Sequence, residues 1–423
     1  MELKKYKKKR ITPQGWKEIT LAEAFNTSSG ATPLSTEASY YENGTIPWIN
    51  SGELASPYIY GTTNFISQAG FENSSTEIYP IDTVLVAMYG ATAGKASLLK
   101  MEACTNQAIC AILPNKDDSS TFLKYSIDTL YDHLVGLSSG SARDNLSQAE
   151  LKKLKLIMPP TKDEQNKLVS ILALIDRKIE LNQVINQNLE AMAKQLYDYW
   201  FVQFDFPNEE GKPYKSSGGE MVWNEKLKRM IPKEWTNANI YQLASISKET
   251  VNPLARPNEL FKHYSLPEYD KTGTYAEEYG IDIQSAKFTV TNNCILVSKL
   301  NPWTSRVICG NRESNQICST EFVVWNPASM KTKGFLFMLA KSAKFIEYCT
   351  QGATGTSHSH RRINPELMMK FDFSYNSEIA IKFSRLIENI IGKLHDNIAQ
   401  LKILTKQRDE LLPLLMNGQI TIE

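Results

Sequence analysis

The chain has 423 residues, 42% of them hydrophobic, and a formal net charge of +1. These values favour two or three folded domains and argue against a disordered or globally basic chain. The six cysteines form no CxxC pair and have no histidine at ligand spacing, so neither a zinc site nor a disulfide scaffold is predicted. No apolar run is long enough to span a bilayer, which favours a soluble, cytoplasmic protein.

Residues 1–160 are predicted to form one α+β domain behind a basic arm at residues 4–10. Short apolar runs bounded by turn residues predict strands, followed by a helical run, a polar loop and a closing strand before the paired prolines. These segments lie at residues 44–54, 78–99, 106–114, 122–134, 138–147 and 154–160.

One long helix is predicted at residues 163–201, within a helical segment that we bound at residues 161–206. In a heptad pattern that starts at Leu168, apolar side chains recur at the a and d positions without any Gly or Pro. The a positions are Leu168, Ile175, Asn182, Leu189 and Leu196, and the d positions are Ile171, Lys178, Ile185, Met192 and Tyr199. At the usual rise, the helix would reach about 55 to 60 Å, the length of a spacer.

Residues 207–230 are rich in Gly, Pro, Lys and Ser and are interpreted as a connector. A second α+β domain is predicted at residues 231–375, because its segments follow the order of the first domain. Its opening IPKEW parallels TPQGW, and NQICSTEFVVWNP parallels NQAICAILPN. The two domains differ where YGATAGK in the first faces KLNPWTSR in the second. Since binding residues concentrate on loops, this pattern indicates two different ligands of one class.

A second long helix, at residues 377–415 within a segment bounded at 376–423, repeats the first. Asn397 minus Asn182 gives an offset of 215, at which apolar residues fall on apolar residues and Lys178 falls on Lys393. A polar Asn at an a position costs stability but fixes helix register. Asn182 and Asn397 are therefore assigned as register residues of an internal repeat.

A repeat of domain, helix, domain, helix predicts a pseudo-two-fold arrangement in which the two helices run antiparallel and hold the domains apart. Two domains on a rigid spacer would recognise a ligand that has two separated sites. Duplex DNA is a polymer of that kind.

The chain also resembles a known family, the specificity subunits of type I restriction-modification enzymes. The resemblance rests on the order of elements and on DEQNKLVSIL, LYDYWFVQFDFP, GKPYKSSGGEMVWNE before IPKEW, and LLPLLMNGQI at the end of the chain. It extends over nearly the whole chain, although the two domains match only in plan.

The resemblance implies a non-catalytic subunit whose two target recognition domains each read one half of an asymmetric, split site in double-stranded DNA. It also implies that the paired helices set the spacing and dock two modification subunits, which methylate adenine with S-adenosylmethionine. Two restriction subunits, translocases that use ATP and Mg, can join this core. No cofactor is expected in the present chain.

Two enzyme motifs are present only in part. GATAGK at residues 90–95 has three residues between its glycines, and Ala96 stands where a phosphate loop needs Ser or Thr. NPWT at residues 301–304 lacks the second proline of the amino-methyltransferase tetrapeptide. The alternatives to a DNA-reading subunit are a stand-alone methyltransferase or nuclease, and a coiled-coil scaffold with two protein-binding domains.

The candidate DNA contacts are basic, aromatic and hydrogen-bonding residues on loops at matching places in both repeats. They are Tyr89, Lys95, Ser141, Arg143 and Asn145 in the first domain, and Lys299, Trp303, Arg306, His358, His360, Arg361 and Arg362 in the second. No catalytic, cofactor-binding or metal-ligating residue is assigned.

Overall fold

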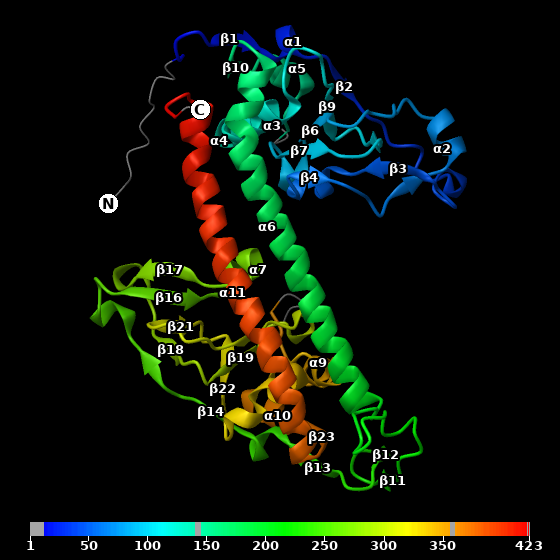
Figure 1. The fold of residues 1–423 in the computed structure, drawn as a ribbon, viewed down its shortest axis with the longest axis vertical. Helices are drawn as coiled ribbons and strands as arrows, with labels where there is room; N and C mark the ends of the chain where they lie inside the picture. The colour runs from blue at the N-terminus through cyan, green and yellow to red at the C-terminus, as the bar shows by residue number, and fades with distance from the viewer. Residues whose placement is uncertain (1–11, 140–144, 356–359, 421, 423) are drawn as a thin grey trace. The chain divides into compact units, whose positions relative to one another are not determined.

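The computed structural model describes residues 12–139, 145–355, 360–420 and 422. They divide into two compact units, each built from one mixed α/β domain and a piece of both long helices (Figure 1). The first unit runs up to Glu180 and resumes at Ile403, and the second is Leu181–Lys402. None of the helices described could cross a membrane.

The first unit contains a five-stranded sheet of order β2-β9-β6-β7-β4 and a smaller sheet of order β5-β3-β8, while β1 pairs with β10. The strands are β1 (Lys17–Thr20), β2 (Thr27–Ser29), β3 (Ile46–Ile49), β4 (Tyr58–Ile59), β5 (Phe65–Ile66), β6 (Val84–Ala87), β7 (Ala96–Leu99), β8 (Cys104–Thr105), β9 (Ile109–Ile112) and β10 (Lys155–Met158). The helices before α6 are α1 (Leu21–Ala24), α2 (Gln68–Glu72), α3 (Ser120–Asp128), α4 (Tyr131–Ser139) and α5 (Gln148–Lys152).

The second unit repeats this plan with a four-stranded sheet, β14-β22-β19-β20, a five-stranded sheet, β15-β18-β21-β16-β17, and the pair β13–β23. The strands are β13 (Thr236–Asn239), β14 (Ala244–Ile246), β15 (Thr250–Val251), β16 (Leu260–Tyr264), β17 (Ala276–Tyr279), β18 (Lys287–Val290), β19 (Ile295–Ser298), β20 (Val307–Cys309), β21 (Gln316–Cys318), β22 (Phe322–Pro327) and β23 (Asp372–Tyr375). Its shorter helices are α7 (Leu266–Thr272), α8 (Lys333–Ala340), α9 (Ala343–Gln351) and α10 (Pro365–Met369).

The two domains share strand register as well as strand order. Val84 to Ala87 of β6 face Ile112 to Ile109 of β9, and Ile295 to Ser298 of β19 face Trp325 to Phe322 of β22, both antiparallel. In each sheet the next strand, β7 or β20, is antiparallel to the central strand as well. The predicted internal repeat and α+β fold class are confirmed.

Alternation along the central strands explains the layers. Val84 and Val86 pack in the cluster that contains Phe122 of α3, whereas Leu85 packs on the opposite face with Ile49. In the second unit Ile295 and Val297 pack with Phe335 of α8, and Leu296 packs with Tyr264. Successive strand residues point to opposite faces, so each central strand is buried by a helix on one side and by a second sheet on the other.

The long helices are α6 (Lys162–Tyr197), which continues into a π-helical turn at Asp198–Val202, and α11 (Ser377–Met416). In the first unit Leu168 and Leu172 of α6 share a core cluster with Leu415 of α11. In the second unit Ala193 of α6 shares one with Ile387 and Ile391 of α11. Within each unit the two pieces run antiparallel (Figure 1).

The predicted d row of the first helix is wrong as a buried row. Ile171, Ile185 and Met192 are 40%, 45% and 57% exposed. The residues four beyond four of the five a positions are buried instead: Leu172, Ile179, Ala193 and Trp200. The reason is that each helix packs on a recognition domain as well as on the other helix, which widens the buried face toward that row.

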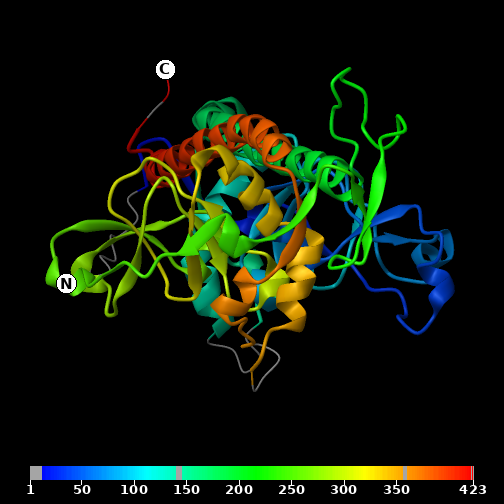
Figure 2. The ribbon, with the colours of Figure 1, turned by 90° about the horizontal axis from the view of Figure 1, so that it is seen from below.

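Three segments have more detail than the sequence pattern predicts. Residues 287–299 of the second domain form two strands in different sheets, β18 and β19, separated by a turn. The helical run at residues 122–134 is two helices, α3 and α4, because the first ends at Asp128. The connector holds a two-stranded hairpin, β11 (Met221–Asn224) with β12 (Arg229–Pro232), which projects beside the end of α6 (Figure 2).

Candidate nucleic-acid interface

In the first unit, the candidate interface is the turn between β6 and β7. Ala87 N donates to Lys95 O at 3.0 Å, and Gly94 N donates to Ala87 O at 2.8 Å, so the turn is closed across its neck. Gly94 has φ +82°, a backbone conformation that favours glycine, and a Cβ built there would be tight against Leu134 Cβ, at 3.2 Å. A phosphate loop would lead into a helix, whereas this turn leads into strand β7.

Tyr89 and Lys95 lie on this turn, and Tyr89 is 36% exposed. Leu146 N donates to Met88 O at 2.9 Å, which places Asn145, the preceding residue, next to the turn. The candidates Ser141 and Arg143 lie outside the described residues.

The second unit presents a turn at the same strand end, between β19 and β20. Ser298 N donates to Arg306 O at 3.0 Å, the equivalent of the bond that closes the first turn. Asn301 and Ser305 both have left-handed backbone, with φ of 48° and 49°, on either side of a 3-10 turn at Pro302–Thr304. Trp303 lies at its tip and is 44% exposed.

A polar loop meets this second turn as well. Ile363 N donates to Lys299 O at 3.0 Å, and Asn301 N donates to Arg361 O at 2.8 Å. The first of these bonds matches the bond from Leu146 to Met88, because each joins the residue after the central strand to the residue after a polar loop. Five candidates are therefore gathered at one strand end: Lys299, Trp303, Arg306, Arg361 and Arg362. His360 is an exposed neighbour in the loop, and His358 lies outside the described residues.

Protein groups hold the three arginines of this cluster. Arg306 forms a two-point ion pair with Asp270, from Nε to Oδ1 at 2.5 Å and from Nη2 to Oδ2 at 2.8 Å. Arg362 makes a similar pair with Glu321, with Nε to Oε2 at 3.0 Å, and hydrogen bonding to that carboxylate raises the pKa of Arg362. Arg361 donates through Nη2 to Ala353 O at 2.6 Å. These contacts fix the guanidinium planes in the structure.

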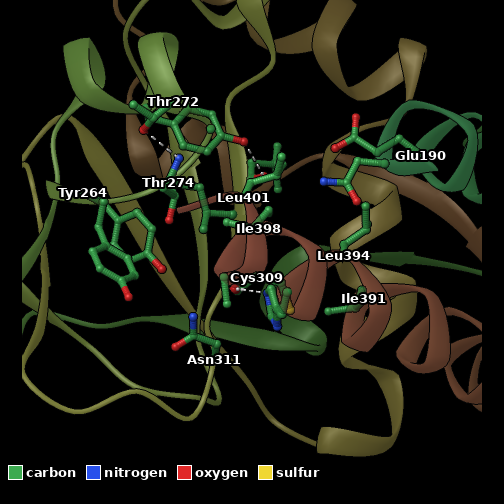
Figure 3. Close-up of a pocket in the computed structure, with 18 of the residues that line it drawn as sticks. Glu190, Tyr264, Thr272, Thr274, Cys309, Asn311, Ile391, Leu394, Ile398 and Leu401 are labelled. Atoms are coloured by element: carbon green, nitrogen blue, oxygen red, sulfur yellow. Dashed lines mark hydrogen bonds between the residues drawn. The ribbon is translucent and has the colours of Figure 1, made fainter. Parts of the chain in front are cut away.

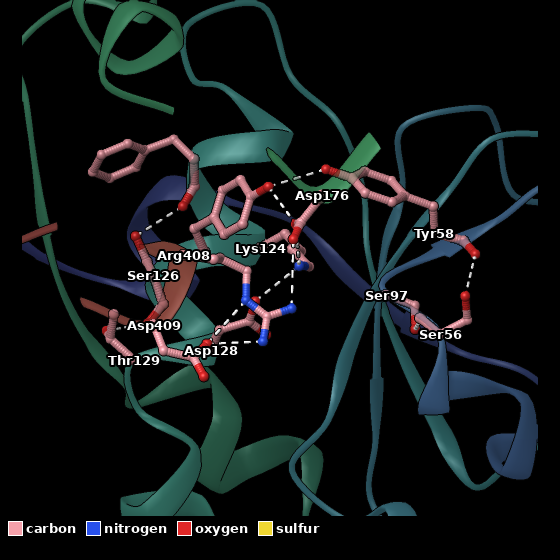
Figure 4. Close-up of polar contacts among 12 residues, drawn as sticks. Ser56, Tyr58, Ser97, Lys124, Ser126, Asp128, Thr129, Asp176, Arg408 and Asp409 are labelled. Carbon is pink, nitrogen blue, oxygen red and sulfur yellow. Dashed lines mark hydrogen bonds and ion pairs between the residues drawn. The ribbon is translucent and has the colours of Figure 1, made fainter. Parts of the chain in front are cut away.

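Sequence reasoning missed a buried ionic cluster in the first unit (Figure 4). Asp176 of α6 is buried and accepts a hydrogen bond from Tyr125 Oη at 2.6 Å, and Nη1 of Arg408 in α11 lies 3.5 Å from its other oxygen. Burial raises the pKa of the Tyr58 phenol, which lies next to Tyr125, to about 12. The sequence did contain a signal for this cluster. Asp176 directly follows the a position Ile175, whereas Ile391, its equivalent in the second long helix, is apolar.

The second unit contains a cavity of about 510 Å³ between α6, α11 and the recognition domain (Figure 3). Its wall includes Glu190, Tyr264, Asn311 and His395. His395 Nε2 lies 3.2 Å from Cys309 O, and burial lowers the pKa of His395, with Lys333 acting in the same direction. The walls carry both polar and apolar side chains. Charged groups around them are paired, as in Lys402 with Glu277 at 2.8 Å.

Comparison with known proteins agrees with this architecture. Residues 13–191 match the family described as the type I restriction modification DNA specificity domain. The specificity subunit of the type I restriction enzyme MjaIX from Methanocaldococcus jannaschii is 26% identical over 97% of this chain and 95% of its own length. The chain is thus similar to a type I specificity subunit along almost its whole length.

Two further proteins are similar to this chain, one in sequence and one in fold. The HindI specificity subunit of Haemophilus influenzae is 24% identical over 69% of this chain and 74% of its own length. The crystal structure of the type I system S subunit from M. genitalium has the same fold, with a TM-score of 0.62 at 14% identity, over 96% of this chain and 97% of that one. The resemblance read from the sequence is confirmed.

Proposed function

We propose that this chain is a specificity subunit that reads an asymmetric, split DNA site, one half with each domain, for a type I restriction-modification complex. The observation that carries the proposal is the repeated strand-end turn. Both domains present it in the same sheet register, after β6 and after β19, and each turn is bonded to a polar loop. The two turns have the same frame and different side chains, which is the arrangement expected for reading two different base sequences.

The turn residues divide into two roles. Lys95 and Lys299 are suited to phosphates as flexible point charges, whereas Tyr89, Asn145 and Trp303 are suited to base edges or sugars. Arg306 and Arg362 already form ion pairs with carboxylates, those of Asp270 and Glu321 respectively. They serve first to hold the turn and the loop in place, and base contact would require a partial exchange of these pairs.

Partner subunits supply the chemistry in this proposal. With a net charge of +1, the chain has little electrostatic attraction of its own for a polyanion. Two modification subunits with S-adenosylmethionine, and restriction subunits with ATP and Mg, would add basic surface and catalytic groups. Tight DNA binding is expected only in the assembled complex, and methylation or cleavage by the pure chain would contradict the proposal.

The half-site assignment is tested by exchanging one turn. The chain is co-expressed with its modification subunits, and methylated adenines are mapped across a genome. Replacing residues 299–306 with another turn of equal length, with Arg306 kept to preserve the pair with Asp270, is expected to change one half of the target and leave the other half intact. A change in both halves, or in neither, would refute separate reading.

The long helices are proposed to set the gap between half-sites and to occupy the segments 161–206 and 376–423. α6 has 36 residues, which corresponds to about 54 Å. Seven residues inserted into both helices would keep the buried rows in phase, add about 10 Å to each helix, and lengthen the gap by about three base pairs. Seven residues in α6 alone serve as the mismatched control, and an unchanged gap in the doubly extended chain would reject the ruler.

A further inference from the structure

Asp176 is the centre of a buried charge cluster that joins three elements of the first unit (Figure 4). Its carboxylate lies 3.8 Å from Lys124 Nζ, on α3, and 3.5 Å from Arg408 Nη1, on α11. Lys124 is itself buried and pairs with Asp128 at 2.9 Å. Tyr125 donates to Asp176, and burial raises the pKa of this phenol, which therefore keeps its proton.

The arrangement discriminates between partner helices, because a buried carboxylate is stable only with its charge partners in place. Lys124 comes from the recognition domain and is shared with Asp128, so the cation that α11 contributes is Arg408. Any helix that took the place of α11 beside Asp176 without a cation at that level would leave the carboxylate short of positive charge.

The internal repeat places an apolar group at every equivalent position of the second unit. At the repeat offset of 215 residues, Ile391 is the equivalent of Asp176, and Ala193 is the equivalent of Arg408. Phe122 and Leu123 of α3 match Phe335 and Leu336 of α8, so Phe337 stands for Lys124 and Met338 for Tyr125. These four residues of the second unit, Ala193, Phe337, Met338 and Ile391, are all buried in one core cluster.

From this difference we propose that Asp176 and Arg408, supported by Lys124 and Tyr125, determine which helix α6 accepts as its partner. The two long helices are alike in their apolar faces, so α6 could also pair antiparallel with α6 of a second copy of this chain. In that pairing Asp176 would face Ala193 of the second copy and lose its arginine. A pair of α11 helices would place Arg408 opposite Ile391, with no carboxylate.

The cluster therefore favours pairing of α6 with α11 and disfavours α6–α6 and α11–α11 pairs, as a buried polar residue does in a coiled coil. The consequence is that one chain brings together two different recognition domains instead of two copies of the same one. The inference concerns helix pairing and does not depend on DNA being the ligand.

The test replaces the ionic cluster with its apolar counterpart in the full chain. The variant is K124F/Y125M/D176I/R408A, and both it and the unaltered chain carry Gln183→Cys as a reporter. In an α6–α6 pair the two reporters lie nearly level, since the pairing centres near residue 184. Lys178→Cys, whose copies would lie about 18 Å apart along the pair, is the control for random collisions. The six native cysteines are buried in the structure.

Reaction with a short bis-maleimide is expected to give at least tenfold more covalent dimer from Gln183→Cys than from Lys178→Cys in the variant, and equal amounts in the unaltered chain. Equal amounts in both backgrounds would overturn the proposal. If the fourfold variant does not fold, D176I/R408A decides in its place, because it keeps the Lys124–Asp128 pair and the Tyr58–Tyr125 contact. A lack of excess dimer from that variant would overturn the proposal equally.

Discussion

Asn182 of α6 donates a hydrogen bond through Nδ2 to Oε1 of Gln400 in α11, at 2.9 Å. Asn397, its equivalent in the repeat, does the same toward Asn186 Oδ1, also at 2.9 Å. The two asparagines thus bond across the helix seam and not to each other. Both bonds belong to the second unit, where they align the helices at one level.

A double-mutant cycle measures what the first of these bonds contributes. Asn182→Ala, Gln400→Ala and the double variant are expected to show a coupling of about 0.5 to 1 kcal/mol in the free energy of unfolding, because a single neutral hydrogen bond contributes about that much. Chemical denaturation gives the values. Zero coupling would mean that the bond has no part in fixing the helix register.

Gly94→Ala is expected to destabilise the first unit by about 1 to 2 kcal/mol, because φ is +82° and the new Cβ would approach Leu134. Gly136→Ala is the matched control. Gly136 lies in α4 with open space around its Cβ position, so alanine there should stabilise by up to about 1 kcal/mol. Thermal unfolding measures both changes, and a neutral Gly94→Ala would show that the turn relaxes.

Lys95→Ala is expected to weaken DNA binding by the assembled complex at every sequence and to reduce the slope of log K against log salt by about 0.9, the loss of one phosphate contact. Lys100→Ala is the control, since Lys100 Nζ is paired with Asp82 at 2.7 Å. Fluorescence anisotropy across a salt series provides the slope. If only one base position changed preference, Lys95 would be a base reader instead.

The second unit is expected to lose stability in mild acid through His395. Burial lowers the pKa of this imidazole in the folded chain below its usual 6.5. At a pH between the folded-state pKa and 6.5, the unfolded chain therefore binds a proton that the folded chain does not. The free energy of unfolding therefore falls as the pH drops below about 6.5 and is unaffected above it. His395→Gln should flatten this dependence in denaturation curves from about pH 7.5 to about pH 5.

The control for this pH dependence is His133→Gln, which replaces an exposed histidine of α4. It should leave the slope of the unfolding free energy against pH unchanged. Identical slopes for the unaltered chain and His395→Gln would show that another group accounts for the acid sensitivity.

By itself, the sequence determined the internal repeat, the two long helices, the α+β class and the resemblance to type I specificity subunits. These follow from periodicity and from matched positions such as Leu172 with Ile387, which are local and additive along the chain. It also placed the candidate contacts on loops at matching places in both repeats, since each loop follows an equivalent apolar run.

The tertiary structure decided which helix row is buried and which charges are paired. Ile171 and Leu172 are equally apolar in sequence, yet only Leu172 is covered, because burial depends on the domain that packs beside the helix. Asp176 and Arg408 are 232 positions apart, and nothing local connects them. Their contact exists because the antiparallel crossing brings the two helices to the same level, and electrostatic energy depends on that distance and on burial.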